Sequence, residues 1–434
     1  MRSDGRPRHT TPLGLCLVGC GGMGERHIRA YAMLKELGLF SFTLDTVCDG
    51  DVDRAERAAS TAERLLGRRP RVYATVHEAL RHEGIDAFDV ATDPSSHRSV
   101  GVQILDAGRH LICEKPLALT TKACWDLVHS ASEHGVVLAT AENLRRDPRI
   151  RTVRSIMESG LLGRTLLIAI EFIGGTDEII ISPWRHLKEK GSIALDLGVH
   201  HTDLISYLAG DFDAAFGSTF IAHEVRRKRK APELDLESYR ARHQEMPPSV
   251  VATGDDSVIA TYRMKSGVIA QYVLILAGPS RSATLSVQGR DGSIVLPLDP
   301  SAGQLSVTVG DSRISEAEIG AFVDAVAPAA GADELHRAAM SSETRDAALI
   351  AIELLDFQRA ILAGTPPEVD GFQGLVAVAA VLAVSRSGQT GRAVRIDRLV
   401  SGGKLGGANG KVDREEARHE RAGTAQPDPY LRKK

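Results

Sequence analysis

Several features that would place this chain in a specialised class are missing from its sequence. The formal net charge is only −3, so no strong field draws the protein to nucleic acid or to an anionic membrane. The longest apolar run, Leu375 to Val384, is too short to span a bilayer. The first twelve residues are polar, with no apolar signal core behind them. We therefore expect a cytoplasmic protein that binds neither nucleic acid nor membrane.

Cysteine is also scarce, and it is not spaced as in a metal site. The five cysteines are Cys16, Cys20, Cys48, Cys113 and Cys124. They lack zinc-site spacing, and the absence of a secretory context argues against disulfides. We expect free thiols in a reducing compartment and no metal site.

The first third of the chain alternates short apolar runs with helical patterns. Strands are expected at 13–18, 44–47, 87–91, 110–113 and 136–139, and helices at 25–37, 51–66, 76–82, 96–107 and 121–133. This alternation is typical of βαβ units, which form a parallel sheet covered on both faces. Right-handed crossovers then predict an α/β fold with a doubly wound sheet over residues 13–145.

The pattern changes after about residue 145. A helical stretch at 148–159 is followed by β-rich stretches at 165–173, 257–264, 268–276 and 283–288, and by helical patterns at 344–362 and 374–387. Several of the β-rich stretches are close enough in sequence to be antiparallel neighbours, with a hairpin turn at 264–267. We expect a second α/β domain with a largely antiparallel sheet over residues 146–400.

Three stretches do not fit a compact core. Residues 1–12 and 401–434 are polar and are expected to be a flexible N-terminus and a disordered tail. Residues 223–250 contain the basic run 226–230 and are expected to form an insertion or long loop. No aromatic residues interleave with these charges, which favours a solvated loop over a nucleic-acid patch.

A glycine-rich turn follows the first expected strand. Residues 19–24, Gly-Cys-Gly-Gly-Met-Gly, fit G-x-G-x-x-G, and a helical pattern starts directly after them. In this motif Gly19 permits a tight turn, Gly21 lets the backbone approach a pyrophosphate, and Gly24 lets helix and strand pack closely. The free N–H groups at the helix start, near Gly22 and Met23, would bind the phosphates.

An acidic residue follows the second expected strand at the spacing of a ribose ligand. Asp49 can accept the adenosine ribose hydroxyls and would repel a 2′-phosphate, which favours NAD over NADP. Arg54 is the nearest possible partner for a phosphate and keeps NADP open. Asp49 could equally cap the next helix, and the sequence does not decide between these roles.

A lysine ends the apolar run at 110–113. The chain has 41 arginines and only 12 lysines, so it strongly prefers arginine as its basic residue. Position 115 of Glu114-Lys115-Pro116 nevertheless carries lysine, which, unlike arginine, can lose its proton at accessible pH. Ligands of open α/β sheets bind at this lip of the sheet. A surface lysine before a turn proline is the alternative.

A carboxylate and an imidazole lie one helical turn apart in the second half. Asp196 and His200 project from one face of an apolar helix pattern, where burying them requires partners. They are candidates for a site; a capping aspartate and a hydrogen-bonded core histidine are the alternative. His201 and Asp203 point elsewhere and are expected to be structural.

Residues 107–116 resemble the first signature of the Gfo/Idh/MocA oxidoreductase family, and residues 196–200 resemble its second. The resemblance implies a Rossmann domain, then an α/β domain with an open-faced sheet, and a homodimer or homotetramer. It implies that Lys115 is catalytic, that Asp196 binds substrate and that His200 transfers a proton. It also implies cofactor contacts from Thr92, His97, Glu114 and Lys115, and substrate contacts from Asn143, Trp184 and Arg185.

These residues predict an NAD(P)-dependent dehydrogenase that acts on a secondary hydroxyl of a sugar, cyclitol or sugar derivative. Either His200 or Lys115 could take the hydroxyl proton, and Asp196 would hold a neighbouring hydroxyl and orient His200. Two alternatives remain. One is redox-neutral glycoside cleavage or epimerisation through a transient keto sugar with retained NAD, and the other is a non-catalytic nucleotide-sensing regulator.

Overall fold

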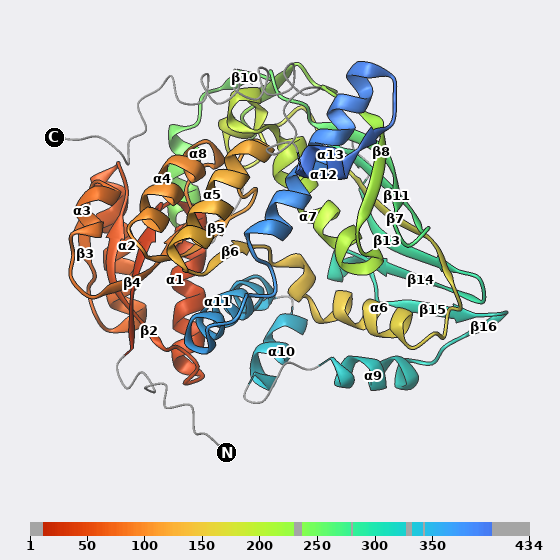
Figure 1. Ribbon diagram of the computed structural model, residues 1–434, viewed down its shortest axis with the longest axis horizontal. Coiled ribbons are helices and arrows are strands. Elements are labelled where there is room, and N and C mark those ends of the chain that lie inside the picture. The colour runs from red at the N-terminus through yellow and green to blue at the C-terminus, as the bar shows by residue number, and fades with distance from the viewer. Residues whose placement is uncertain (1–11, 230–236, 279–280, 327–331, 342, 402–434) are drawn as a thin grey trace.

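The computed structural model describes residues 12–229, 237–278, 281–326, 332–341 and 343–401 (Figure 1). The expected flexible N-terminus and disordered tail therefore lie outside the described residues, apart from Pro12 and Ser401. Two large sheets dominate the molecule. The first lies at the left of Figure 1, the second at the right, and helices of the second half of the chain lie between them.

The first sheet has six parallel strands in the order β3-β2-β1-β4-β5-β6. Its elements are β1 (Leu13–Val18), α1 (Gly22–Glu36), β2 (Phe42–Cys48), α2 (Val52–Leu66), β3 (Arg71–Tyr73), α3 (Val76–Leu80), β4 (Ile85–Val90), α4 (Pro94–Asp106), β5 (His110–Glu114), α5 (Thr121–His134) and β6 (Leu138–Ala141). This order is that of a Rossmann fold, which confirms the predicted doubly wound sheet. The strand order reverses at β1, and the carboxyl ends of the strands there form the ligand edge.

Two local differences from the prediction have a simple cause. β3 was not expected, because its three residues are partly exposed and form no apolar run. β6 starts two residues later than expected, since Val136 and Val137 belong to the segment that connects α5 to β6.

The second half of the chain forms a nine-stranded sheet in the order β16-β15-β14-β13-β7-β12-β11-β8-β17. All neighbours are antiparallel except β7 and β12, so the sheet is mixed but mostly antiparallel, as predicted. The strands are β7 (Thr165–Ile173), β8 (Phe212–Phe220), β11 (Ser257–Met264), β12 (Ile269–Ile275), β13 (Ser282–Gly289), β14 (Gly292–Pro297), β15 (Ser306–Val309), β16 (Ser312–Arg313) and β17 (Val394–Arg395). The expected turn at 264–267 joins β11 to β12, with Gly267 at φ 85°.

The helices of the second half connect the two sheets. They are α6 (Pro148–Glu158), α7 (Ser192–Ala209), α9 (Glu316–Ala325), α10 (Asp333–Met340), α11 (Arg345–Ala363), α12 (Gly371–Thr390) and α13 (Ile396–Val400). α11 packs into the core on one face of the first sheet, and α7 and α12 pack into the core on its other face. The division at residue 145 stays a prediction, because both sheets share these helices.

One described helix, α12, is long and apolar enough to cross a membrane by length and composition alone. Most of it is buried inside the molecule, where it packs on α7, α5 and β8. Core helices pass the same test, so its composition is explained by its position between the sheets.

The insertion at 223–250 has regular structure of its own, which corrects the expectation of a solvated loop. β9 (Val225–Arg227) pairs with β10 (Ser249–Val251), and α8 (Glu237–Glu245) lies between them in sequence. Arg226 is fully buried and forms an ion pair with Asp256 at 2.5 Å. The sequence could not show this, because a basic run gives no sign that one member has a buried partner.

This burial predicts that two neighbouring arginines differ sharply in their effect on stability. Arg226→Leu leaves the Asp256 carboxylate buried without its cation, which lowers the free energy of unfolding by about 3 kcal/mol. Arg227→Leu removes an exposed ion pair with Asp177 and costs less than about 1 kcal/mol. Urea unfolding of both variants measures the difference. Equal losses would contradict the assigned role of Arg226.

Candidate active site

The glycine turn forms a cradle that side chains would fill. Gly19 has φ 94°, and a Cβ there would lie 2.6 Å from the Ala91 carbonyl carbon. A Cβ on Gly24 would lie 2.2 Å from the Gly19 oxygen, so Gly24 allows close packing between turn and helix. α1 has no side-chain cap at Gly21, which leaves its first N–H groups available for phosphate.

Asp49 joins this cradle from the end of β2. Its Oδ2 accepts the Cys20 N–H at 2.8 Å, and its Oδ1 accepts the Asp51 N–H at 2.9 Å. Burial raises the pKa of Asp49, although nearby Arg54 opposes the shift. The cap of α2 is Asp51, whose side chain accepts the Arg54 N–H, so the alternative role of Asp49 as a helix cap is wrong.

A cavity of about 310 Å³ opens over the glycine turn. Its walls include most of the predicted cofactor residues and two of the predicted substrate residues: Gly19, Gly21, Gly22, Met23, Asp49, Thr92, Trp184 and Arg185. The glycine cradle, the free helix N-terminus and the acid at the second strand together fit a dinucleotide. Gly24 lies behind this wall and serves packing.

Lys115 and Asp196 meet where the first sheet faces α7. The Lys115 ammonium donates to Asp196 Oδ1 and to the Asp196 carbonyl oxygen, both at 3.0 Å. Arg185 Nε donates to Asp196 Oδ2 at 2.8 Å. Burial by itself would raise the pKa of Asp196. The nearby cations Arg185 and Lys115 outweigh this effect and hold the pKa well below its usual range. Asp196 therefore remains an anion that fixes both cations.

His200 lies one turn further along α7 and is held by Glu142 at the end of β6. Its Nδ1 lies 2.6 Å from Glu142 Oε1, and no described residue binds its Nε2. Burial raises the pKa of Glu142, whereas His200 and Lys115 lower it, so the carboxylate stays ionised. The expectation that Asp196 orients His200 is wrong, because Glu142 does so. No pattern in the sequence marks Glu142 as a residue of the site.

The remaining predicted residues lie around this centre rather than in the cavity wall. His97 is fully buried, with Nδ1 2.9 Å from the Pro116 carbonyl and Nε2 3.3 Å from the Thr92 carbonyl. This position contradicts direct cofactor contact and makes His97 a support for both loops. Asn143 follows Glu142, and its buried Oδ1 has no partner among the described residues. The Lys115–Pro116 peptide is cis.

His201 and Asp203 have structural partners, as predicted. His201 Nδ1 lies 3.0 Å from the Tyr272 hydroxyl, and Asp203 accepts Arg145 Nε at 2.8 Å. Burial lowers the pKa of His201 to about 3, so this imidazole is neutral. His201 therefore does not compete with His200 for a proton.

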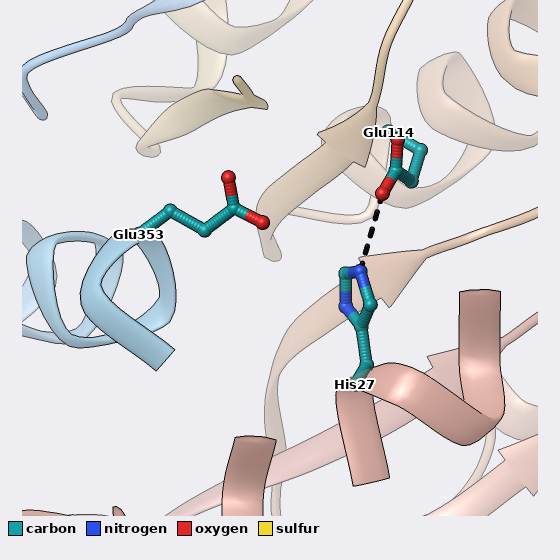
Figure 2. A group of neighbouring side chains, drawn as sticks. All are labelled: His27, Glu114 and Glu353. Atoms are coloured by element: carbon teal, nitrogen blue, oxygen red, sulfur yellow. Dashed lines mark hydrogen bonds and ion pairs between the residues drawn. The ribbon is translucent and has the colours of Figure 1, made fainter. Parts of the chain in front are cut away.

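Glu114 also lies behind the centre, in a buried network that supports Lys115. It accepts the Lys115 N–H at 3.0 Å and contacts His27 Nε2 at 3.3 Å, while His27 Nδ1 contacts Asp89 at 2.7 Å. Figure 2 shows Glu114 from β5, His27 from α1 and Glu353 from α11 pointing toward one another. Their ligand atoms lie within 4.8 Å of one another, but hydrogen bonds already engage both nitrogens of His27. The group is therefore a hydrogen-bonded support.

The buried carboxyl group of Glu353 leads us to expect that the stability of the protein depends on pH. Burial, reinforced by Glu114, raises its pKa well above the usual range. The folded protein thus keeps a proton that the unfolded chain loses above about pH 4.3, so stability falls as pH rises. Glu353→Gln removes this loss and should raise the melting temperature by about 2 °C or more at about pH 8, but not at about pH 4. Calorimetry beside the exposed control Glu334→Gln measures it; an equal gain at both pH values would contradict a protonated Glu353.

Together, a Rossmann cradle for a dinucleotide and a lysine–aspartate–histidine centre at its edge define a nicotinamide-dependent oxidoreductase. Residues 13–142 match the model of an oxidoreductase family with an NAD-binding Rossmann fold, and residues 150–295 match the C-terminal domain model of the same family. The chain belongs to the Gfo/Idh/MocA family, and its cofactor is NAD. The predicted family, fold and cofactor are confirmed.

Known relatives share this architecture. Levoglucosan dehydrogenase of Pseudarthrobacter phenanthrenivorans is 28% identical over 293 residues, which are 65% of this chain and 73% of that protein. The 1,5-anhydro-D-fructose reductase of Ensifer adhaerens is 25% identical over 350 residues, 79% of this chain and 89% of that protein. A solved structure of levoglucosan dehydrogenase with NADH and L-sorbose has a TM-score of 0.71 at 22% identity. That match covers 89% of this chain and 99% of that one, and it shows the same fold.

Proposed function

We propose that this protein is an NAD-dependent dehydrogenase that oxidises a secondary hydroxyl of a sugar, cyclitol or sugar derivative. The observation that carries the proposal is the pair of ionic contacts Lys115–Asp196 and His200–Glu142, side by side at the ligand edge of a dinucleotide cradle. Relatives named for levoglucosan, D-apiose and inositol support a polyol substrate.

The geometry divides the two tasks that alcohol oxidation requires. Bound NAD supplies the hydride acceptor. His200 takes the hydroxyl proton at Nε2, because Glu142 holds Nδ1 and leaves the other nitrogen without a described partner. Lys115 gives two N–H groups to Asp196 and keeps a third for the substrate oxygen, where a positive charge stabilises the developing alkoxide.

Asp196 acts as a positioning residue in this scheme. Its two carboxylate oxygens are occupied by Lys115 and Arg185, and its pKa is held low, so it neither gives nor takes the reacting proton. The guanidinium of Arg185 also lies 4.6 Å from the Trp184 ring centre, which fixes the wall of the cavity next to the cofactor.

A panel of sugars, cyclitols and glycosides with NAD tests the proposal by the absorbance of the reduced nicotinamide. A dehydrogenase accumulates NADH in proportion to the substrate consumed. Product formation without NADH would favour redox-neutral chemistry through a keto sugar. Intact NAD binding with no turnover across the panel would favour a nucleotide-sensing regulator.

We further propose that the protein is a cytoplasmic homodimer or homotetramer. The five cysteines are buried and free, which suits a reducing compartment. Large apolar side chains are exposed on the outward face of the nine-stranded sheet: Phe216, Phe220, Ile259, Ile269 and Val295. A second copy covering this face would bury them. Sedimentation velocity measures the state, and a monomer at all concentrations would contradict the proposal.

A further inference from the structure

A helix from the second half of the chain lies directly on the glycine turn. α8, within the insertion, contacts α1 at its first turn. The Ser238 N–H and hydroxyl both donate to Glu25 Oε2, at 3.1 and 2.6 Å. Tyr239 and Arg242 form part of the wall of the cofactor cavity. This helix thus reaches the phosphate-binding end of the Rossmann fold.

The glycine turn carries a residue that accommodates this helix. The pattern G-x-G-x-x-G leaves position 22 open to any residue, yet this chain has Gly22 there. A Cβ on Gly22 would lie 2.0 Å from Cε1 of Tyr239. The Arg26 guanidinium lies 5.2 Å from the same ring centre. The close packing of the Tyr239 ring on residue 22 therefore explains the glycine there, which the dinucleotide motif does not.

Arg242 brings a positive charge to the uncapped N-terminus of α1. Its Nη2 lies 3.0 Å from the position that a Cβ on Gly21 would occupy, and no carboxylate of the described residues forms an ion pair with it. Burial lowers the pKa of Arg242, and the nearby cations Arg185 and Arg54 lower it further. Several guanidinium groups beside free helix N–H groups favour the binding of an anion between them.

The attachment of α8 is polar and local. Its sequence, Glu-Ser-Tyr-Arg-Ala-Arg-His-Gln-Glu, has no apolar stripe that would anchor it in a core. Behind the helix lies a second cavity of about 810 Å³, and Tyr239 lines both cavities. Elements with few buried apolar contacts open at low free-energy cost. The helix can thus leave the turn without disturbing either sheet.

We propose that α8 is a clamp on the bound dinucleotide, in which Arg242 is a ligand of the cofactor phosphates and Tyr239 seats the helix on Gly22. This inference rests on the proposed function, because it takes NAD as the cofactor. Release of the dinucleotide then requires α8 to leave the glycine turn. The time that α8 stays on the turn then sets how long the cofactor stays bound.

The first test compares Arg242→Met with Arg240→Met, an exposed arginine on the same helix outside the cavity wall. Calorimetry measures the dissociation constants of NADH, ADP and adenosine for the wild type and both variants. Arg242→Met should raise the constants for NADH and ADP about 10- to 100-fold, as expected for a lost charge-assisted hydrogen bond. Adenosine has no phosphate, so its constant should not change. Arg240→Met should match the wild type.

The second test examines the seat of the helix by a double-mutant cycle. Gly22→Ala should displace Tyr239 and speed NADH release about tenfold in stopped-flow displacement, whereas adding Gly22→Ala to Tyr239→Ala should have little further effect. If the effects of Gly22→Ala and Tyr239→Ala on the release rate add in the double variant, Gly22 serves the phosphates directly. That result would contradict the packing of Tyr239 on Gly22 as the reason for this glycine.

The outcomes separate this inference from the proposed function. Failure of the wild type to bind NADH would reject the function itself. Normal NADH binding with no change in Arg242→Met would overturn only the phosphate contact. Tighter NADH binding by Arg242→Met or Tyr239→Ala would overturn the clamp as well, because it would show that α8 obstructs the cofactor.

Discussion

Lys115→Met is expected to lower kcat for the best polyol substrate by about 10³-fold, while the dissociation constant of NADH changes less than about threefold. The ammonium donates twice to Asp196 and has one N–H left for the substrate oxygen. Methionine has a similar length but offers neither charge nor donor. The loss therefore falls on the transition state, where the alkoxide develops, rather than on the cofactor.

Steady-state kinetics and calorimetry measure the two quantities. Lys122→Met is the matched control, because Lys122 lies on α5 and makes an exposed pair with Asp126. A variant at position 115 that kept most of its turnover would remove Lys115 from the chemistry. An equal loss of NADH affinity would instead assign it to cofactor binding.

Glu142→Gln is expected to lower kcat by about 10³-fold with KM changed only a few-fold, because the imidazole base would lose its orienting anion. Glu142 is buried at the end of β6, and its pKa is held low by His200 and Lys115 despite burial, so its charge persists across the working range. Glutamine keeps the size of the side chain but removes the charge that stabilises a protonated His200.

The double variant Glu142→Gln with His200→Asn separates orientation from other effects. If Glu142 acts through His200, the double variant should be about as slow as His200→Asn alone. The exposed Glu133→Gln on α5 is the control for a charge change. A large rise in KM with unchanged kcat would show that Glu142 contacts the substrate instead.

The strands and motifs of the first half were predictable because local rules fix them. The apolar run 13–18 is β1 to the residue, and the glycine turn follows it as the motif requires. Lys115 was identified from its place at the end of a buried strand. Asp196 and His200 were identified from their helical spacing, and both do contact residues that follow strands of the first sheet, Lys115 and Glu142.

Contacts between distant segments were not predictable from one sequence. Glu142 has no neighbouring signal that marks it as the partner of His200, which is 58 residues away in the chain. The basic run at 226–230 hid the buried Arg226, because its partner Asp256 is 30 residues further on. His97 fitted a cofactor loop by position, yet both ring nitrogens face backbone carbonyls.

The packing of α11 on α1 has a consequence for synthesis of the protein. Buried residues of α11, among them Ile350, Leu354 and Phe357, complete the core on one face of the first sheet. A nascent chain that ends near residue 145 has all six parallel strands with α1 and α2, but it lacks the apolar side chains of α11 that complete this core. The core of the Rossmann sheet is therefore complete only after about two hundred further residues have been synthesised, and we expect a fragment cut at residue 145 to aggregate rather than fold alone.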